Sequence, residues 1–321
     1  MKAELIFKSE RKDWTVHNSD IICGMVILNY NDFLTTSHLL NMIKGYESIE
    51  HIVVVDNHST DDSYKQLKKF EDEHIEVILA PENGGYSSGN NIGIRYLMER
   101  YHIDILGISN SDVEFEESFI LKIKSDYLKK GQYSIITGMQ IAPNGEIAIH
   151  PFWEIEDANS YLHKKWRELF CKNKKKYERY IEQKLSVKDE IIQVGAVEGS
   201  LFFINAKDFE KIGYFDENLF IYMEEDILGT KISKINKKVG VDRSINYIHY
   251  GAKTTDNVLT TKAKITYVCR SNIYYFEHYL SNNKLLHLIN RILCYLISCR
   301  QYIIFGIRKN LKKYRCRSNN E

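Results

Sequence analysis

Short apolar runs alternate with helix-like stretches over the first 110 residues of the chain. Four runs have the length of buried strands, namely 21–28 (IICGMVIL), 52–55 (IVVV), 75–79 (IEVIL) and 103–108 (IDILGI). Between them apolar residues recur at helical spacing over 33–46, 62–73 and 91–101. Runs of this kind are typical of strands that are covered on both faces. The pattern therefore predicts a parallel sheet built from βαβ units.

Polar, turn-forming clusters follow each of these four predicted strands. They lie at 29–32 (NYND), 56–62 (DNHSTDD), 81–85 (PENGG) and 109–112 (SNSD). In an open parallel sheet the carboxyl ends of the strands share one edge, and ligands bind there. We therefore expect the four loops to build one polar crevice.

The rest of the chain gives weaker signals. A strand is predicted at 134–138, a second at 201–205 with a helix starting near Lys207, and a later helix that ends at Gly240. Residues 163–188 are rich in Lys and low in aliphatic side chains. They are predicted to form a solvated helix or a mobile loop, with a basic surface for anionic lipid or substrate as the alternative.

The composition indicates a folded globular protein and excludes some classes of binding partner. The 321 residues are 44% hydrophobic with only 3 Pro, which excludes fibrous and mostly disordered chains. The 44 Lys and Arg nearly cancel the 43 Asp and Glu, so a globally basic nucleic-acid binder is excluded. The six cysteines form no C-x-x-C pair, and we expect reduced thiols in a cytosolic protein.

Targeting signals are not expected. The first twenty residues carry charges and lack the apolar stretch of a signal peptide. The most apolar region, 285–306, is interrupted by Arg291 and Arg300, so we do not expect it to cross a bilayer.

Several side chains in the expected crevice have suitable chemistry for a ligand. Asp112 ends a buried strand and is the best candidate for Mg²⁺ or Mn²⁺, although Asn-Ser-Asp is also ordinary turn chemistry. Asp56 could bind a base or ribose, or form an Asx turn or helix cap. The glycines in 83–85 and 89–91 let the backbone approach a phosphate before a helix.

Further candidates lie later in the chain. Glu224, Glu225 and Asp226 open a helix, where the dipole favours ionised carboxylates, and one of them could take a proton from a hydroxyl. The alternative is a solvated helix start. His249 is a second candidate for a metal or phosphate contact, or a structural histidine.

One motif points to a different enzyme class. Residues 85–89 (GYSSG) match the G-x-S-x-G of an α/β serine hydrolase with Ser87 as nucleophile and His249 downstream. The residues Pro81-Glu82-Asn83-Gly84 intervene between strand and glycine, which disfavours a nucleophile elbow.

Taken together, six short segments resemble the family 2 glycosyltransferases of the GT-A fold, in particular the rhamnosyltransferase-like enzymes of bacterial capsule and O-antigen assembly. The segments lie in order between residues 21 and 275, at 26–31 (VILNYN), 53–61 (VVVDNHSTD), 83–93 (NGGYSSGNNIG), 110–113 (NSDV), 198–217 (EGS to GYFDE) and 222–226 (YMEED). The resemblance implies a Rossmann-like, mostly parallel central sheet flanked by helices, with a C-terminal helical extension.

The resemblance also implies roles for individual residues. Nucleotide-sugar contacts fall on Asn29, Asp56, Asn57, Asn83, Gly85, Asn90, Ser111 and Gly199. Asp112 matches the last acid of the family's metal motif, whose first position here is Asn110, and His249 matches a downstream histidine that contacts metal or diphosphate. The base motif falls on Glu225, with Glu224 and Asp226 as the alternatives in register.

The implied reaction is transfer of a sugar, with inversion, from a nucleotide diphosphate-sugar of the dTDP-rhamnose or UDP-hexose type. Mg²⁺ or Mn²⁺ is the implied cofactor, and the acceptor is a saccharide or lipid-linked saccharide hydroxyl. The implied catalytic domain is 1–262, with a nucleotide-sugar half at 21–112 and an acceptor half at 190–262. A catalytically silent nucleotide-sugar-binding protein is the alternative.

The tail, 263–321, mixes aromatic and aliphatic residues with Lys and Arg. One interpretation is an amphipathic helix on anionic lipid, which places the protein at the inner face of the cell membrane. The other is a set of helices that cover the catalytic domain or form a homodimer contact.

Overall fold

The computed structural model describes residues 21–170, 174–251 and 259–318, and the side chains of 174–176 and 308–318 lie outside that description. Two compact units are present. The first unit comprises Met1–Ile155, Leu185–Phe220 and Glu224–Thr254, and the second comprises Glu156–Lys184, Ile221–Met223 and Thr255–Glu321. Each unit draws on several segments of the chain, so a division at residue 262 stays a prediction.

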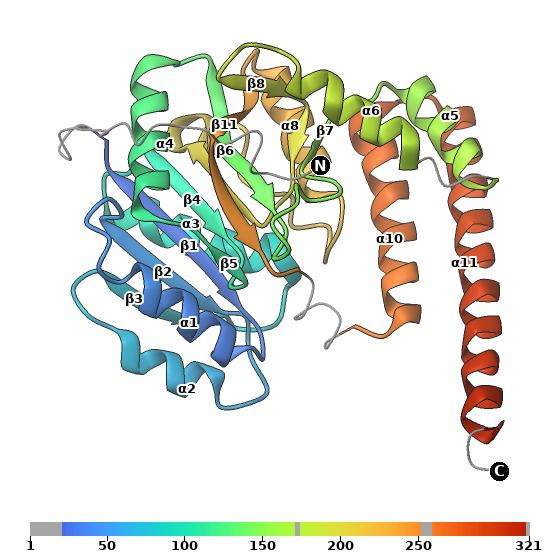
Figure 1. The fold of residues 1–321 in the computed structure, drawn as a ribbon, viewed down its shortest axis with the longest axis horizontal. Coiled ribbons are helices and arrows are strands. Elements are labelled where there is room, and N and C mark those ends of the chain that lie inside the picture. The colour runs from blue at the N-terminus through green and yellow to red at the C-terminus, as the bar shows by residue number, and fades with distance from the viewer. Residues whose placement is uncertain (1–20, 171–173, 252–258, 319–321) are drawn as a thin grey trace. The chain divides into compact units, whose positions relative to one another are not determined.

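A nine-stranded sheet forms the centre of the first unit (Figure 1). Its strands are β1 Cys23–Asn29, β2 His51–Asp56, β3 Ile75–Leu79, β4 Ile105–Ser109, β5 Val113–Glu114, β6 Tyr133–Ile141, β8 Ile191–Val194, β10 Leu201–Asn205 and β11 Lys238–His249. Eight of them follow the order β3-β2-β1-β4-β10-β6-β11-β5, and β8 pairs with β11. A separate small sheet joins β7 Phe152–Trp153 to β9 Ala196–Val197.

The four strands predicted from apolar runs are the parallel half of this sheet. β3, β2, β1 and β4 lie side by side and parallel, and the register pairs Asn29 with Asp56 and Asp56 with Leu79. Their carboxyl ends therefore share one edge, as the sequence predicts. The antiparallel strand β10 interrupts the parallel order between β4 and β6.

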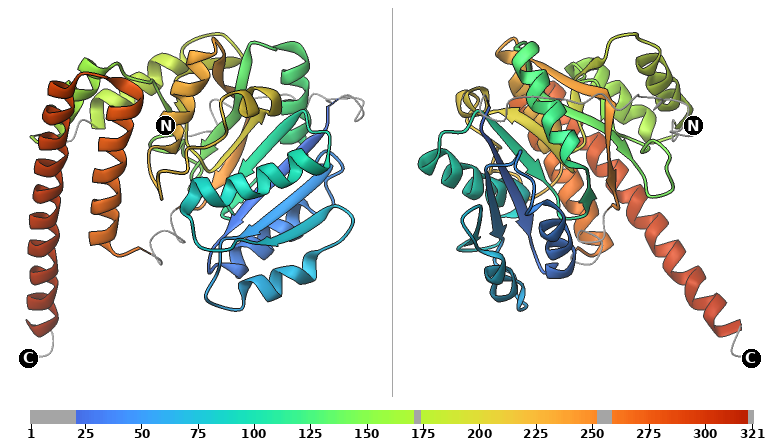
Figure 2. Two further views of the ribbon diagram at one scale, coloured as in Figure 1. Left: turned by 180° about the vertical axis from the view of Figure 1, so that it is seen from behind. Right: turned by 60° about the vertical axis from the view of Figure 1, so that its left-hand side comes forward.

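Helices cover both faces of the sheet in the first unit. Their bounds are α1 Phe33–Ile43, α2 Ser63–Leu67, α3 Gly85–Arg100, α4 Glu117–Lys129, α7 Ala206–Lys211 and α8 Glu224–Lys234, with a 3₁₀ turn, η2, at Lys68–Phe70. Side chains of α1, α2 and α4 share one buried cluster with alternate residues of the strands, such as Met25 and Ile27. Seen from behind in Figure 2, α3 lies across the opposite face of the sheet.

Helix α3 sits close to the sheet because of a glycine. A Cβ at Gly93 would lie 2.7 Å from Val26 Cγ1 and 2.9 Å from Val55 Cγ2, distances at which something must shift. The glycine therefore lets the helix backbone approach β1 and β2. This approach carries the N-terminus of α3 to the edge at which those strands end.

Three predicted boundaries are wrong. Helix α3 begins at Gly85 and not at residue 91, since packing of the helix outweighs the poor helix propensity of 85–90 (GYSSGN). Helix α8 ends at Lys234, and Gly240 lies inside β11. The helix predicted at 62–73 is only one turn of α-helix followed by η2.

The second unit is helical in its described part. It contains α5 Ala158–Glu168, α6 Lys174–Leu185, α10 Thr261–Tyr275, a π-helical turn (η3) at Phe276–Leu280 and α11 Lys284–Ser318. The ring of Tyr161 packs against those of Tyr275 and Phe276, and its hydroxyl donates to Asn272 Oδ1 at 2.5 Å. Arg300 Nη1 donates to the carbonyl of Glu168 at 2.7 Å and ties α11 to α5.

The long helix α11 changes one sequence expectation. Its segment Lys284–Ile307 is long and apolar enough to cross a membrane, and is the one such helix among the described residues. Arg291 and Arg300 do not shorten it below that length, because two arginines spread over 24 residues leave the average composition apolar. The core helix of a soluble protein can have the same length and composition, so these two properties do not by themselves decide the role of α11.

The cysteines described in the structure are free thiols. Cys23, Cys269 and Cys294 are buried and Cys299 is exposed. Cys171 and the side chain of Cys316 lie outside the described residues, as do the first twenty residues with their predicted lack of a signal peptide.

Candidate functional site

Asn29 and Asp56 meet at the carboxyl ends of β1 and β2. Asn29 Nδ2 donates to Asp56 Oδ2 at 2.8 Å, and both side chains are fully buried. Asp56 also accepts from the backbone N–H of Ser59 at 2.8 Å and from its hydroxyl at 2.8 Å. Parallel pairing of the two strands places these side chains in register, so the contact follows from the sheet itself.

Asn57 and Asn83 extend this polar edge toward α3. Asn57 Nδ2 donates to Asn83 Oδ1 at 3.0 Å and to the carbonyl of Gly85 at 3.1 Å. Gly85 has φ +87, and a Cβ there would lie 2.1 Å from the Phe220 carbonyl oxygen. Only glycine fits this turn, which starts α3 and lets the Tyr86 N–H donate to the same carbonyl at 2.9 Å.

Two buried acceptors on this edge have no hydrogen-bond partner within the described part of the chain. They are Asn57 Oδ1 and Asn90 Oδ1, whose residues are 3% and 0% exposed. Asn90 Nδ2 donates to the Tyr86 carbonyl at 3.0 Å, which leaves its oxygen as the unpaired atom. Since buried polar atoms are nearly always paired, these two acceptors are suited to donors of a bound ligand.

Asp112 and His249 are brought together by a strand pairing. The short strand β5 pairs with the end of β11, so that His249 lies opposite Val113, the residue after Asp112. The Tyr250 N–H donates to the Asp112 carbonyl at 2.9 Å. His249 Nε2 lies 3.2 Å from Asp112 Oδ1, and both side chains are less than a tenth exposed.

Two further residues surround His249. Its Nδ1 lies 2.7 Å from Gln140 Nε2 and 3.4 Å from Glu198 Oε2. Gln140 Nε2 in turn donates to Glu198 Oε2 at 2.7 Å. Burial acts to lower the pKa of His249, but the neighbouring Asp112 and Glu198 carboxylates outweigh it and raise the pKa to about 9. We call Asp112, Gln140, Glu198 and His249 the histidine cluster.

The donor set of this cluster is compatible with a divalent ion. Two ligands bound at about 2.1 Å and at right angles would stand about 3 Å apart, close to the 3.2 Å between Asp112 Oδ1 and His249 Nε2. Among the described residues no group of three or more His, Cys, Asp or Glu side chains is arranged around a metal position. An ion held here would therefore complete its shell with water and ligand oxygens, as Mg²⁺ usually does.

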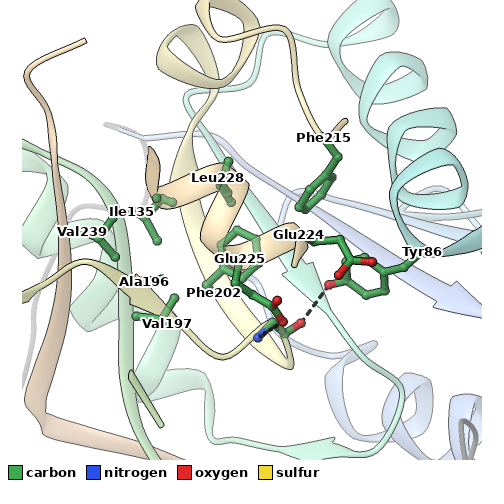
Figure 3. A pocket seen from close by; sticks show the side chains of 12 residues that line it. Tyr86, Ile135, Ala196, Val197, Phe202, Phe215, Glu224, Glu225, Leu228 and Val239 are labelled. Atoms are coloured by element: carbon green, nitrogen blue, oxygen red, sulfur yellow. Dashed lines mark hydrogen bonds between the residues drawn. The ribbon is translucent and has the colours of Figure 1, made fainter. Parts of the chain in front are cut away.

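The three acids at the start of α8 differ in their surroundings. Glu224 and Glu225 line a small pocket, whereas Asp226 Oδ1 accepts from Trp153 Nε1 at 3.2 Å. Figure 3 shows Tyr86, Glu224 and Glu225 close together, with the apolar side chains of Val197, Leu228 and others along the remaining wall. Burial and the adjacent Glu224 raise the pKa of Glu225 well above its ordinary value.

Gly199 connects the separate parts of the site. Its N–H donates to Glu225 Oε1 at 3.2 Å, and its carbonyl accepts from Tyr86 Oη at 2.8 Å. A Cβ at this position would lie 2.7 Å from Glu225 Oε1. Its neighbour Glu198 belongs to the histidine cluster, so one short segment touches that cluster, the start of α3 and the start of α8.

The structure thus gathers the residues selected from the sequence along one edge of the first unit. Ser111 is buried in the turn beside Asp112. The sequence alone assigns no role to Gln140, Glu198 or Tyr86, although Tyr86 stands in the segment 83–93 and Glu198 in the segment 198–217 that contribute to the resemblance. No feature of the sequence around Gln140 marks it as a site residue. It lies near His249 only because β6 and β11 pair in parallel, with Gln140 opposite Tyr247.

The geometry disfavours the serine hydrolase. Ser87 lies within the first turn of α3, is 1% exposed, and its Oγ has no hydrogen-bond partner in the described residues. A nucleophile must contact its base, whereas His249 contacts Gln140, Glu198 and Asp112.

Comparison with known sequences gives one family and one curated relative of note. The profile of glycosyl transferase family 2 matches residues 25–183, about half of the chain. The low-salt glycan biosynthesis hexosyltransferase Agl10 of Haloferax volcanii is 26% identical over 226 residues, which are 70% of this chain and 66% of the relative. The chain therefore spans about two thirds of the length of that relative.

Solved structures share the fold at low sequence identity. The mannosyltransferase PcManGT from Pyrobaculum calidifontis, in complex with GDP-Man and Mn²⁺, has a TM-score of 0.54 at 13% identity, covering 98% of this chain and 88% of that one. GalNAc-T7 with UDP, GalNAc and Mn²⁺ has a TM-score of 0.54 at 15% identity, covering 85% and 54%. S. aureus TarS 1-349 with UDP-GlcNAc has a TM-score of 0.53 at 14% identity, covering 84% and 70%.

These likenesses establish the α/β, GT-A-like fold that the sequence predicts. They do not support the narrower expectation of a capsule rhamnosyltransferase. The curated relative is a hexosyltransferase of an archaeon, and the three solved structures are complexes with GDP-Man, with UDP and GalNAc, and with UDP-GlcNAc.

Proposed function

Because the chain belongs to glycosyltransferase family 2 and has the GT-A fold, we propose that it transfers a hexosyl group from a nucleoside diphosphate sugar to an acceptor hydroxyl. The observation that carries the proposal is the continuity of the site in the first unit. Asn57 contacts Gly85 at the start of α3, Tyr86 contacts Gly199, and Gly199 contacts Glu225. The polar edge, the start of α3 and the carboxylate of Glu225 are thus connected through neighbouring contacts.

The polar edge is suited to the nucleotide. Asn57 Oδ1 and Asn90 Oδ1 are buried acceptors that lack partners among the described residues, and a base or ribose supplies N–H and O–H donors. Asp56 accepts three hydrogen bonds, and a carboxylate offers about four acceptor positions, so one remains for a base N–H. Asn29 and Asn83 hold these side chains in place.

Asp112 and His249 are the residues that would hold Mg²⁺ or Mn²⁺. When bound, the ion would supply positive charge against the diphosphate oxygens of the leaving group. Gln140 and Glu198 fix the ring of His249 from its Nδ1 side, which leaves Nε2 directed at Asp112. Orienting a histidine ligand through its second nitrogen is how proteins usually build such contacts.

Glu225 is the proposed general base. Its Oε1 accepts from the Gly199 N–H, which fixes the carboxylate at the pocket. The raised pKa of Glu225 makes the ionised form a stronger proton acceptor, suited to removing the proton of an attacking hydroxyl. Glu224 also lines the pocket and is the second candidate, whereas Asp226 is bonded to Trp153. The acceptor oxygen would attack in a single displacement that inverts the anomeric carbon.

The donor and acceptor follow from the relatives only as classes. The structural neighbours are complexes with UDP, GDP-Man and UDP-GlcNAc, so UDP- and GDP-hexoses join dTDP-sugars as candidate donors. The curated relative acts in glycan biosynthesis, which supports a saccharide acceptor, including one on a lipid carrier. This acceptor class is the second part of the proposal.

A donor screen tests the transferase. Thermal shift with Mn²⁺ and a panel of UDP-, GDP- and dTDP-sugars should identify a donor, and release of its nucleoside diphosphate should then depend on an added saccharide acceptor. Glu225→Gln should abolish transfer and retain donor binding, while Glu210→Gln, an exposed acid of α7, should leave both unchanged. Near-normal transfer by Glu225→Gln would refute the base assignment.

The same screen separates the two alternatives. A catalytically silent binding protein would bind donor without releasing nucleotide in the presence of any acceptor. A serine hydrolase would react with a fluorophosphonate at Ser87, which the burial of that residue disfavours.

A further inference from the structure

The helix α11 of the second unit carries one continuous exposed apolar face. Eight of its large apolar side chains are 38% to 64% exposed, namely Leu285, Leu288, Ile289, Ile292, Tyr295, Leu296, Ile303 and Ile307. At 100° per residue these positions fall within an arc of about 120°. We call this face the apolar stripe. Its extent is far beyond the isolated exposed leucines of an ordinary surface.

The opposite side of α11 explains why the stripe stays outward. Asn290, Leu293, Cys294 and Ile297 are buried, with at most 8% exposure. These side chains lie on the far side of the helix from the stripe and attach it to the second unit. The helix is therefore held by one face, and its orientation within the unit is fixed.

Basic residues flank the stripe on both sides. By the same helical geometry, Lys284 and Arg291 lie along one border and Arg300 lies along the other. Arg291 is half exposed and bonded to Glu277 at 2.5 and 2.7 Å, which holds its aliphatic stem beside the stripe. An apolar face bordered by Lys and Arg is the pattern of a helix that lies in a membrane interface.

Charge is divided unevenly between the two units. The second unit carries 21 Lys and Arg against 8 Asp and Glu, a net charge of +13, while the remainder carries 23 against 35, a net charge of −12. A near-neutral chain therefore contains a strongly basic helical unit. Basic clusters beside an amphipathic helix bind the anionic surface of a bilayer.

Two aromatic side chains add to the same unit. Trp166 and Phe170 are 55% and 67% exposed, and their rings lie 5.4 Å apart. They flank Glu168, whose carbonyl accepts from Arg300 on α11. Trp is enriched at the level of lipid headgroups, because its ring is apolar and its N–H is polar.

We propose that the apolar stripe of α11, with the basic residues of the second unit, is a docking surface for an anionic lipid bilayer. The helix lies along the interface with Leu288, Ile292 and Leu296 among the acyl chains, and does not span the membrane. A span would bring Arg291 into the hydrocarbon core and strip away the buried contacts of Asn290 and Leu293. No residue of the proposed transferase site belongs to this surface, so the test of the surface is independent of that function.

Vesicle flotation of the full chain tests the surface. Binding should be strong to vesicles of phosphatidylglycerol and phosphatidylcholine, and at least roughly tenfold weaker to phosphatidylcholine alone or at high salt. The triple variant Leu288→Asn/Ile292→Asn/Leu296→Asn should lose roughly tenfold or more of the binding to anionic vesicles. An alkaline carbonate wash should release the wild-type protein.

Leu34→Asn is the matched control, because Leu34 is 78% exposed in the first unit and lies outside the stripe. It should bind vesicles as the wild type does. Equal binding to neutral vesicles, unchanged binding of the triple variant, or resistance to carbonate would each overturn the proposal. So would a wild-type dimer that dissociates in the triple variant without any vesicle binding, since the stripe would then be a contact between two copies. Circular dichroism of the variant shows whether it folds, and Leu288→Asn alone provides a milder change.

Discussion

A buried charge cluster in the first unit makes stability depend on pH in a way that one substitution should remove. Lys122 is 1% exposed on α4, and its ammonium contacts Asp126 Oδ1 at 2.5 Å as well as Asp242 on β11. Burial and the adjacent Asp242 raise the pKa of Asp126 from 3.8 to about 7, while the Lys122 contact acts in the opposite direction. The pKa of Asp242 is lowered, although burial acts to raise it, because Asp126 and Lys122 stabilise its ionised form.

The direction of this pH dependence follows from the proton that Asp126 keeps in the folded state. Between pH 3.8 and about pH 7 the folded chain keeps a proton on Asp126 that the unfolded chain has released. The contribution of Asp126 is therefore complete below pH 3.8 and is lost as the pH rises through 7. At about 1.4 kcal/mol per pH unit, the loss between pH 5 and pH 7 amounts to about 2 kcal/mol, after allowing for half-ionisation at the upper limit.

Asp126→Asn should abolish this part of the pH dependence. The amide keeps the shape of the protonated acid, accepts from Lys122 with its oxygen and donates to Asp242 with its nitrogen. The difference in free energy of unfolding between the variant and wild type should change by about 2 kcal/mol from pH 5 to pH 7, in favour of the variant at the higher pH. Urea unfolding followed by circular dichroism measures it, and hydrogen exchange of β6 and β11 peptides restricts the result to the first unit.

Glu99→Gln, at an exposed acid of α3, is the control and should follow the wild type at every pH. The reasoning would be refuted if the unfolding free energies of Asp126→Asn and wild type stayed parallel over this range. Lys122→Met tests the same cluster by removing its positive charge. It leaves Asp126 and Asp242 buried without their cation, which costs about 3–5 kcal/mol at neutral pH.

Three further predictions concern the glycines and the proposed metal ligand. Gly85→Ala should destabilise the first unit by about 2 kcal/mol or more in urea unfolding, because it combines φ +87 with a Cβ 2.1 Å from the Phe220 carbonyl, and an unchanged midpoint would contradict this. Gly93→Ala should lower the free energy of unfolding, because overpacking against Val26 and Val55 costs about 1–3 kcal/mol and outweighs the roughly 1 kcal/mol gained in helix propensity. Gly306→Ala in α11 is the control. A Cβ there has nothing within 4 Å among the described residues, so this variant should gain stability by helix propensity alone. Asp112→Ala should weaken Mn²⁺ binding in calorimetry and remove metal-dependent transfer, and full activity in EDTA would count against the metal role.

The sheet edge is the part of the site that sequence reasoning predicts best. Asn29 and Asp56 end apolar runs that are buried on both faces, and parallel strands necessarily bring such ends together. Asp112 follows from the same argument. The acids at 224–226 are predicted because they open a helix whose apolar spacing is clear.

The features that the sequence does not reveal depend on contacts between segments far apart in the chain. Gln140 is the second-last residue of β6, and nothing in the local sequence distinguishes it from another polar strand residue until β11 is placed beside it. The start of α3 at Gly85 is missed because Gly, Ser and Asn favour turns, and only the packing of Gly93 against β1 and β2 overrides that preference. The role of α11 is similar, since its buried and exposed faces are known only once α5 and α10 are in place.

The irregularity in β11 has a consequence for how this chain can vary. Asp242 pairs with Gly138 of β6 and Asn246 pairs with the next residue, Met139, so residues 243–245 of β11 have no partner on β6. After this irregularity His249 lies opposite Val113 of β5. Because side chains alternate along a strand, inserting or deleting one residue in that segment would turn His249 to the opposite face of the sheet, away from Asp112. A change of two residues would preserve the side on which it emerges. Among related chains that keep this histidine beside the aspartate, length changes between 242 and 249 should therefore come in even numbers.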